Sequence, residues 1–327
     1  MTLRVALYGA GAIGSHLAWR LARAGARVCA VARGRRLQAI RGDGIRIETA
    51  GTVSALPVTA EEDPSRLGPQ DVVVIAVKER DLGSVAAGMA PLLRPDTAIV
   101  SVQNGIPWWY FGQRSGRACL DLPARHPAAL ALEQVVGPRP LFGAVVSSPS
   151  TLRASGVVEL DGARHTIRLG ITVPDQSRTA ADMLVRLWST GGMDAATSED
   201  VREQVWEKLV RNACTGLIAL LTNSAPATAL ADPVLHRLSC AIAHEIAATA
   251  KAYGYSPDPN SSSLATARAL GHLPSLVQDF RAGRTPDLAC QFIMPLEMAR
   301  QAGVAVPQLE QLAALARGLL ANMTYST

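Results

Sequence analysis

Short apolar runs alternate with amphipathic stretches up to about residue 197, a pattern that predicts a largely parallel β-sheet covered by helices. The apolar runs that predict strands are residues 3–8, 28–32, 71–77, 97–102, 141–147, 156–160, 166–169 and 193–196. Residues 44–60 alternate more loosely and predict short antiparallel or edge strands. Helices are expected directly after the first strand and at 175–189. This alternation predicts an α/β fold with a doubly wound, Rossmann-type sheet.

The pattern changes after residue 197, where apolar positions follow helical spacing and the alternation with strands does not return. We therefore expect two domains, a Rossmann-like domain at 1–197 and an all-helical domain at 198–327. Helices of the second domain are expected to include residues 205–213, 231–253 and 263–271 and to begin near 274, 284 and 306. With 327 residues and 48% hydrophobic composition, the chain is large enough for two cores.

Three glycines follow the first strand and begin the first helix, in the stretch Gly9-Ala-Gly-Ala-Ile-Gly14. A strand, a glycine-rich turn and a helix are typical of a dinucleotide-binding site, where backbone N–H groups at the helix N-terminus hold the pyrophosphate. Gly9 allows the tight turn, Gly11 leaves room for the phosphates, and Gly14 lets the helix pack close to the sheet. With Ala12 and Ile13 these glycines are the predicted cofactor-binding residues. A βαβ unit that binds nothing is the alternative.

The second strand is followed by Arg33-Gly-Arg-Arg36 and not by the Asp or Glu that usually holds the ribose 2′-hydroxyl of NAD. A guanidinium can bind a 2′-phosphate through two hydrogen bonds, so we expect NADP as the cofactor. Arg33 is the first candidate for this contact, and Arg35 or Arg36 is the second. A solvated basic turn is the alternative.

Lys78 and Asn104 come at the carboxyl ends of two buried strands, where ligands of open α/β sheets bind. The Lys78 ammonium is placed to meet cofactor or substrate, and the Asn104 amide to bond a nicotinamide ribose or a substrate oxygen. Each has a structural alternative, because a lysine can begin a helix and Asn104-Gly105 is a turn signal. The dense aromatic run Trp108–Phe111 either walls a pocket or interface or fills a core. Residues 112–137 show no period and predict either a long loop over the site or an oligomer contact.

Charge, cysteine content and the N-terminus narrow the class of protein. The net charge is +5, but the basic residues are scattered and do not predict a nucleic-acid partner. The five cysteines form no Cys-x-x-Cys pair and no metal-ligand spacing, so we expect free thiols in a reducing compartment and no metal. The chain enters a core strand at once and has no run long enough to span a membrane, so a cytoplasmic protein is expected.

Lys208, Asn212 and Gly216 follow one another at intervals of four and share one row of the first helix of the second domain. Asn212 and Gly216 fall in the apolar sector that Val205 and Leu209 mark. A lysine and an asparagine in this row would line a polar cleft against a buried helix face. A lysine at the edge of that face that extends to water is the alternative.

Taken together, the motifs resemble the ketopantoate reductase (2-dehydropantoate 2-reductase) family over nearly the whole chain. The matching residues are Gly9, Gly11 and Gly14; Arg33-Gly34; Val77-Lys78; Gln103-Asn104-Gly105; Trp206, Lys208, Leu209 and Asn212; Ser275, Gln278 and Asp279; and Gly303 to Pro307. The resemblance implies NADPH-dependent reduction of a 2-oxo acid in a cleft between two domains, and so a role in pantothenate biosynthesis. It also implies Lys208 as general acid, Asn104 and Asn212 as residues that hold substrate and cofactor, and Ser275 as a contact of the substrate carboxylate.

Three departures from the family pattern concern the substrate. Asp287 stands where the family usually has Glu and is one methylene shorter; it is expected to hold a substrate hydroxyl, or else to serve only a helix dipole. Gly216 replaces a second Asn and is expected to enlarge the space beside the row. Cys290-Gln-Phe-Ile-Met294 replaces the usual Ile-Asn-Gly. We therefore expect the best substrate to be a different or bulkier 2-oxo acid than ketopantoate.

Reduction of a ketone needs a proton donor beside the carbonyl, and partial burial is expected to lower the pKa of Lys208 while Asp287 raises it. Two other functions stay open. One is a related NADP-dependent dehydrogenase of another hydroxy acid or an imine, and the other is a non-catalytic NADP sensor, against which the presence of both Lys208 and Asn212 argues. The oligomeric state is not fixed by the sequence, and a homodimer is compatible with it.

Overall fold

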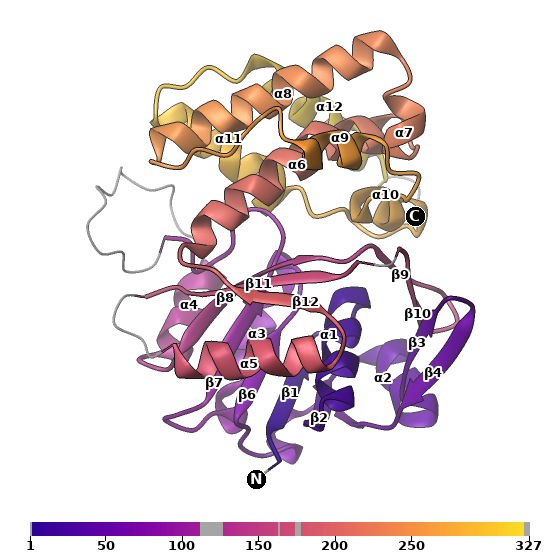
Figure 1. Cartoon of the computed structure of the whole chain (residues 1–327), viewed down its shortest axis with the longest axis vertical. Helices are drawn as coiled ribbons and strands as arrows, with labels where there is room; N and C mark the ends of the chain where they lie inside the picture. Colours follow the sequence, from indigo (N-terminus) through magenta and orange to yellow (C-terminus); the bar gives the residue numbers. More distant parts are fainter. Residues whose placement is uncertain (1, 112–126, 163, 174–177, 324–327) are drawn as a thin grey trace. The chain divides into compact units, whose positions relative to one another are not determined.

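The computed structural model describes residues 2–111, 127–162, 164–173 and 178–323 (Figure 1). These residues form two compact units. The first comprises the described residues up to Gln103, residues 108–111, and residues 127–201; the second comprises Asn104–Pro107 and the described residues from Arg202 onward. The predicted fold class is confirmed, because a Rossmann-type α/β unit is followed by a unit whose described elements are all helices.

Eight strands form the main sheet of the first unit, in the order β12-β11-β8-β7-β6-β1-β2-β5. Their bounds are β1 (Arg4–Tyr8), β2 (Arg27–Val31), β5 (Thr59–Glu61), β6 (Val72–Ile75), β7 (Ala98–Val102), β8 (Leu141–Ser147), β11 (Thr166–Ile171) and β12 (Asp194–Thr197). The six strands from β5 to β8 in this order are parallel, as in a dinucleotide-binding sheet. The carboxyl ends of β1, β2, β6 and β7 therefore share one edge of the sheet, where ligands of such sheets bind.

A second, four-stranded sheet has the order β4-β3-β10-β9, with β3 (Ile45–Thr49), β4 (Thr52–Leu56), β9 (Ser150–Leu152) and β10 (Val157–Leu160). The loosely alternating region 44–60 forms the antiparallel pair β3–β4 and the edge strand β5, in agreement with the prediction. Strand β9 was not predicted, because three residues are too few to show a period.

Five α-helices belong to the described part of the first unit: α1 (Ala12–Arg23), α2 (Gly34–Asp43), α3 (Leu82–Gly88), α4 (Pro127–Val136) and α5 (Thr179–Thr190). Helix α4 corrects the expectation of a loop through residue 137. Its Ala- and Leu-rich sequence favours a helix, with Ala129, Leu132 and Val136 on a buried face. Residues 112–126 of the predicted loop lie outside the described residues.

Both faces of the main sheet are buried, as continuous apolar strands require. On one face, alternate strand residues such as Leu7 and Val74 join a core with Leu17 of α1 and Trp188 of α5. Helices α1 and α5 contact each other over this core and lie side by side in Figure 1. On the other face, Val73, Ile75 and Ile99 are completely buried. The sheet is therefore a rigid platform for the residues at its carboxyl edge.

The aromatic run Trp108–Phe111 fills a core, which decides between the two alternatives for it. None of its four side chains is more than 8% exposed. The Trp108 indole donates a hydrogen bond to Ser101 Oγ at 3.0 Å, and the Trp109 ring occupies the place that a side chain at Gly143 would need. These residues hold β7 and β8 together in the first unit.

A chain of buried polar side chains anchors α1 within the first unit. Arg20 Nε donates to His16 Nε2 at 2.8 Å, while His16 Nδ1 and His165 Nδ1 each lie 2.9 Å from Ser148 Oγ. Because arginine can only donate, a neutral His16 must carry its proton on Nδ1 and donate to Ser148, whose hydroxyl then donates to His165. Burial and then the nearby charges of Arg20 and His165 hold the pKa of His16 well below its ordinary value, so His16 stays neutral.

The second unit is built around α6 (Val201–Leu221), in which Trp206, Leu209, Ala213 and Leu217 form a buried stripe. The other helices are α7 (Pro226–Ala229), α8 (Pro233–Ala252), α9 (Ser262–Arg268), α10 (Ser275–Arg281), the π-helical turn η4 (Ala289–Ile293), α11 (Met294–Gln301) and α12 (Pro307–Met323). The helix expected near 284 begins only at Ala289, because the residue before Pro286 is disfavoured in helical conformation. Among the described helices, none is long and apolar enough to cross a membrane.

Candidate functional site

The glycine turn after β1 has the backbone that a pyrophosphate site requires. Gly9 has a φ of 103°, which favours glycine, and a Cβ there would lie 2.7 Å from the carbonyl oxygen of Ala76. A Cβ at Gly14 would meet the carbonyl oxygen of Gly9. At Gly11, in contrast, an added Cβ would have no neighbour within 4 Å. Two glycines therefore allow close packing, and the middle one borders open space.

Gly11 is also the N-cap of α1, and it has no side chain to cap the helix. The first amides of a helix have no intrahelical acceptor, so those of Ala12 and Ile13 are available to a ligand. The first turn carries no acidic residue that would repel an anion. Open space, backbone donors and the positive end of the helix dipole fit the pyrophosphate of a dinucleotide.

Arg33 lies at the neighbouring carboxyl end of β2, where it is the N-cap of α2. Its side chain is 60% exposed, and its Nη2 donates to Asp81 Oδ1 at 3.0 Å. Arg35 is exposed, whereas Arg36 donates all three of its hydrogen bonds to protein acceptors. Arg36 is therefore occupied, which leaves Arg33 and Arg35 as candidates for a 2′-phosphate. Lys78 is half-buried and begins the turn η2 (Glu79–Asp81) after β6.

Lys208 and Asn104 meet in the second unit. Lys208 Nζ donates to Asn104 Oδ1 at 2.6 Å. Asn104 reaches this place because the next residues dock on η4: the Ile106 amide donates to the carbonyl oxygen of Cys290 at 2.9 Å. Gly105 has a φ of 74°, and a Cβ there would collide with the same Cys290 carbonyl. The glycine of the Asn-Gly pair thus allows the approach that delivers Asn104 to Lys208.

The surroundings of Lys208 change its acidity. Burial lowers its pKa from 10.5 to about 7, and the positive charge of Arg211 acts in the same direction. The burial effect agrees with the expectation from sequence, and Arg211 is an influence that the sequence did not reveal. An ammonium with a pKa near 7 can donate its proton at neutral pH, which ordinary lysines do poorly.

Asn212 is oriented by Gln291, a residue that was not predicted for the site. Asn212 Nδ2 lies 3.4 Å from Gln291 Oε1, and Gln291 Nε2 donates to the backbone carbonyl of Asp287 at 3.1 Å. Because a carbonyl can only accept, it fixes which end of the Gln291 amide faces Asn212. Gln291 is 4% exposed and lies in the π-helical turn, a distortion that is frequent at functional sites. Its separation of 79 residues from Asn212 leaves no spacing signal in the sequence.

The structure corrects the expectation that Gly216 opens a space. A Cβ at this position would lie 3.2 Å from Leu276 Cδ1 and 3.3 Å from Phe292 Cζ. Two apolar side chains therefore pack against the glycine, and no room is left there for a bulkier substrate. Gly216 allows α10 and η4 to approach α6 closely.

The remaining predicted residues lie on the two segments that pack against α6 at Gly216. Ser275 is exposed as the first residue of α10. Asp287 is half-buried two residues before η4, and its backbone accepts the Gln291 hydrogen bond. On α10, Asp279 is buried and accepts a hydrogen bond from Arg284 Nε at 3.0 Å. The second unit thus joins Lys208 to Asn104 by a hydrogen bond, places Asn212 one helical turn further along α6, and holds Ser275 and Asp287 on neighbouring segments.

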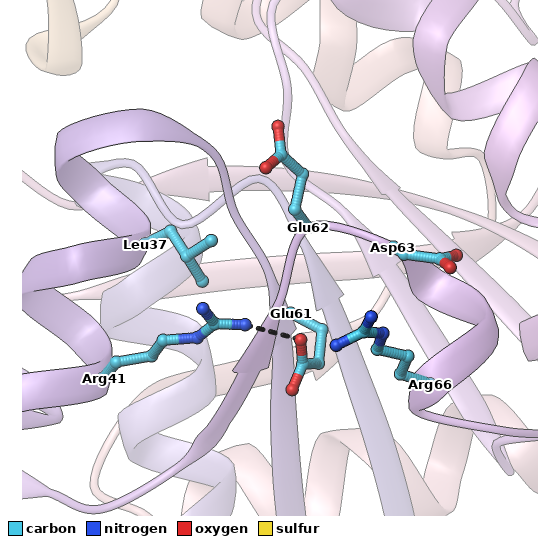
Figure 2. Close-up of a pocket in the computed structure, with 6 residues that line it drawn as sticks. All are labelled: Leu37, Arg41, Glu61, Glu62, Asp63 and Arg66. Atoms are coloured by element: carbon cyan, nitrogen blue, oxygen red, sulfur yellow. Dashed lines mark hydrogen bonds and ion pairs between the residues drawn. The ribbon is translucent and has the colours of Figure 1, made fainter.

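A hollow of about 450 Å³ lies elsewhere in the first unit, against α2 and β5 (Figure 2). It is lined by Leu37, Arg41, Glu61, Glu62, Asp63 and Arg66. Figure 2 shows the Glu61 carboxylate between two guanidinium groups, with Arg41 Nη2 at 2.5 Å. Three carboxylates make this hollow unsuitable for a pyrophosphate or an oxo acid, and it contains none of the predicted site residues.

Comparison with known proteins shows the family of this chain. The family model "Ketopantoate reductase PanE/ApbA" matches residues 5–108, and its companion "Ketopantoate reductase PanE/ApbA C terminal" matches residues 200–320. A 2-dehydropantoate 2-reductase from Mesorhizobium japonicum is 32% identical over 322 residues, which is 97% of this chain and 98% of the relative.

Solved structures show the same fold. A 2-dehydropantoate 2-reductase from Geobacter metallireducens GS-15 superposes with a TM-score of 0.82 at 27% identity, covering 97% of this chain and 100% of the other. D-mandelate dehydrogenase, solved with NADH and anilino(oxo)acetate, superposes with a TM-score of 0.85 over 98% of this chain and 100% of its own; at 18% identity this likeness concerns the fold alone. On the two family models and the 32% identity, the chain belongs to the ketopantoate reductase family of oxidoreductases.

Proposed function

We propose that the protein reduces a 2-oxo acid to the 2-hydroxy acid with NADPH, and that Lys208 is the general acid. The observation that carries this proposal is the ammonium of Lys208, whose pKa is lowered to about 7 and which donates to Asn104 at 2.6 Å. Residues 1–197 would bind the cofactor, and residues 198–327 together with Asn104 would hold the substrate. The bound nicotinamide supplies the hydride, and the protein supplies the proton and the orientation.

Lys208 is suited to both electrostatic tasks of this reaction. The Lys208 ammonium, which Asn104 holds by a hydrogen bond, would polarise the substrate carbonyl. The attraction increases as negative charge develops on that oxygen. Because the lysine is a stronger acid than usual, it can then transfer a proton to the oxygen at neutral pH.

The amides beside Lys208 would orient the substrate. Since Asn104 Oδ1 accepts from Lys208, its Nδ2 faces away as a donor suited to a substrate oxygen or a cofactor ribose hydroxyl. Asn212 gives its Nδ2 to Gln291, so its Oδ1 is the end that would accept from a substrate hydroxyl. Ser275 would contact the substrate carboxylate.

For the cofactor we propose NADP, held through its 2′-phosphate by Arg33. The first turn of α2 contains no acidic residue and begins with Arg33, so helix dipole and guanidinium both favour an anion. The contact with Asp81 is an exposed ion pair, which contributes about 0–1 kcal/mol and is readily replaced by a phosphate. We expect NADPH to bind at least tenfold more tightly than NADH, a difference of about 1.4 kcal/mol.

Asp287 bears on which 2-oxo acid is the preferred substrate. A carboxylate one methylene shorter than Glu reaches less far toward a substrate hydroxyl, which still favours an oxo acid other than ketopantoate. The sequence also predicted a space at Gly216 that would favour a bulkier oxo acid. That argument does not hold, because Leu276 and Phe292 fill the space. Ketopantoate therefore belongs in any substrate panel as a full candidate.

One set of assays tests the proposal. Oxidation of NADPH and NADH is followed at 340 nm with ketopantoate and a panel of other 2-oxo acids and imines, for the wild type, Lys208→Met and Arg33→Ala. The proposal predicts turnover of a 2-oxo acid that Lys208→Met lowers by about 10²–10⁴-fold. Arg33→Ala is expected to abolish the preference for NADPH. A protein that binds NADPH but turns over none of the substrates would instead act as a sensor, and turnover of an imine alone would identify the related dehydrogenase.

A further inference from the structure

Arg36 makes three hydrogen bonds that converge on the glycine turn and its surroundings. Its Nε donates to the carbonyl oxygen of Ala10 at 2.7 Å, its Nη2 to Ser15 Oγ at 2.8 Å, and its Nη1 to the carbonyl oxygen of Gly156 at 2.7 Å. The Ser15 hydroxyl in turn donates to the same Ala10 carbonyl at 3.2 Å. The guanidinium on α2 and the hydroxyl on α1 thus hold one peptide of the glycine turn, and the Gly156 carbonyl before β10 holds the guanidinium.

The peptide that Arg36 holds is the one that carries the Gly11 amide. In a trans peptide the carbonyl oxygen and the following N–H point in opposite directions. When Arg36 and Ser15 fix the Ala10 carbonyl, they therefore also fix the direction of the Gly11 N–H. That N–H lies at the residue beside which an added Cβ would meet nothing within 4 Å. The direction of a donor at the mouth of the dinucleotide site is thus set from α2.

We propose that Arg36 is a positioning residue of the pyrophosphate site, which aims the backbone donors of the glycine turn and does not itself contact the 2′-phosphate. This rests on the proposed function, since it assumes that a dinucleotide binds here. It separates two arginines of one helix turn that look equivalent in the sequence. Arg33 is exposed and would recognise the 2′-phosphate, while Arg36 shapes the site that every adenine dinucleotide uses.

The environment of Arg36 supports this division. Burial, together with the charge of Arg46, lowers the pKa of Arg36 to about 10, so it remains a cation at neutral pH. A partly buried cation is stabilised by its acceptors, and here they are the two carbonyls and the Ser15 hydroxyl. A lysine offers one compact charge and could not hold three acceptors in this fixed geometry.

The test compares two probes that differ only in the 2′-phosphate, NADH and NADPH, by calorimetric titration of the full-length protein. Arg36→Ala is expected to weaken both about tenfold or more, with the ratio of the two dissociation constants unchanged. Arg33→Ala is expected to weaken the binding of NADPH alone. Arg41→Ala is the matched control, because it removes a guanidinium of the same helix that donates to the Ala60 carbonyl oxygen and to the Glu61 carboxylate. Figure 2 shows the contact with Glu61, and the substitution should leave both dissociation constants unchanged. Thermal melting accompanies each titration to confirm folding.

The outcomes separate this inference from the proposed function. Loss of NADPH binding alone in Arg36→Ala would make Arg36 a ligand of the 2′-phosphate and overturn the inference, as would unchanged binding of both probes. Full recovery in Arg36→Lys would show that charge and not geometry matters, and would also overturn it. If Arg36→Ala does not fold, Ser15→Ala replaces it: a loss of several-fold for both probes supports the inference, and no loss contradicts it. A wild type that binds neither probe overturns the proposed function itself.

Discussion

The strongest test of the proposed mechanism is the pH dependence of kcat/KM for reduction, because this parameter reports the pKa of essential groups in the free enzyme. With the Lys208 pKa at about 7, reduction requires the ammonium and should decline above neutral pH. An ordinary lysine, with a pKa of 10.5, would leave the profile flat to beyond pH 9. The structure therefore predicts a titration where lysine chemistry usually shows none.

The magnitude follows from the fraction of Lys208 that is protonated. That fraction is about 0.9 at pH 6, about 0.5 at pH 7 and about 0.1 at pH 8, and it falls about tenfold for each further unit. Between pH 6 and pH 9, kcat/KM should decrease by about two orders of magnitude. The difference from an ordinary lysine corresponds to about 5 kcal/mol in the relative stability of the two protonation states.

Two substitutions assign this titration to Lys208. Lys208→Arg keeps a positive charge that does not titrate in this range, so its lower kcat/KM should be independent of pH. Arg211→Met removes a charge that lowers the Lys208 pKa, so the midpoint should move to higher pH. A wild-type profile that is flat from pH 6 to 9, or an equal decline in Lys208→Arg, would refute the assignment.

Three further predictions concern contacts of the described residues. Gly216→Asn should lower the free energy of unfolding by about 1–3 kcal/mol in thermal melts, because Leu276 and Phe292 already fill the space, whereas an unchanged melting temperature would contradict the packing described. Gln291→Leu should lower kcat/KM about tenfold with the best oxo acid by removing the acceptor that orients Asn212; a drop in melting temperature with normal kinetics would instead mean a structural role. The pKa of His16 is lowered in the folded state, so below pH 6.5 the unfolded chain binds more protons than the folded chain. The free energy of unfolding should therefore decrease as the pH is lowered below 6.5, by up to about 1.4 kcal/mol per pH unit. Urea titrations at pH 7 and 5 measure this fall, and it should be smaller in His16→Asn.

Features that depend on residues close together in the sequence, such as strands, turns and helix faces, could be predicted. The parallel strands could be predicted as continuous apolar runs, because a strand that is buried on both faces has apolar side chains at nearly every position. The glycine turn could also be predicted, because a Cβ at Gly9 or Gly14 would collide with a backbone atom, so that only glycine fits at these positions. The row of Lys208 and Asn212 follows from helical spacing alone.

Contacts between distant segments could not be predicted in this way. Periodicity places Gly216 on a helix face but does not say that Leu276 and Phe292 fill the space beside it. Nor does it show that Gln291 faces Asn212, or that Arg36 turns toward Ala10 while Arg33 stays exposed. In each case a segment far along the chain decides the role of the residue. The association of Asn104 with Lys208 came from the family resemblance and not from either residue's neighbours.

The docking of Asn104–Pro107 on η4 has a consequence for how such proteins can be recombined. The hydrogen-bond partner of Lys208 is encoded within the stretch that forms the Rossmann-type unit, almost a hundred residues before the helical unit begins. A chimera that joins the first 201 residues of one relative to the helices of another would therefore place a foreign Asn-Gly loop beside Lys208. Residues 202–327 made alone would lack Asn104 altogether. A working exchange of the helical unit between relatives therefore requires that residues Asn104–Pro107 be exchanged together with the helices on which they dock.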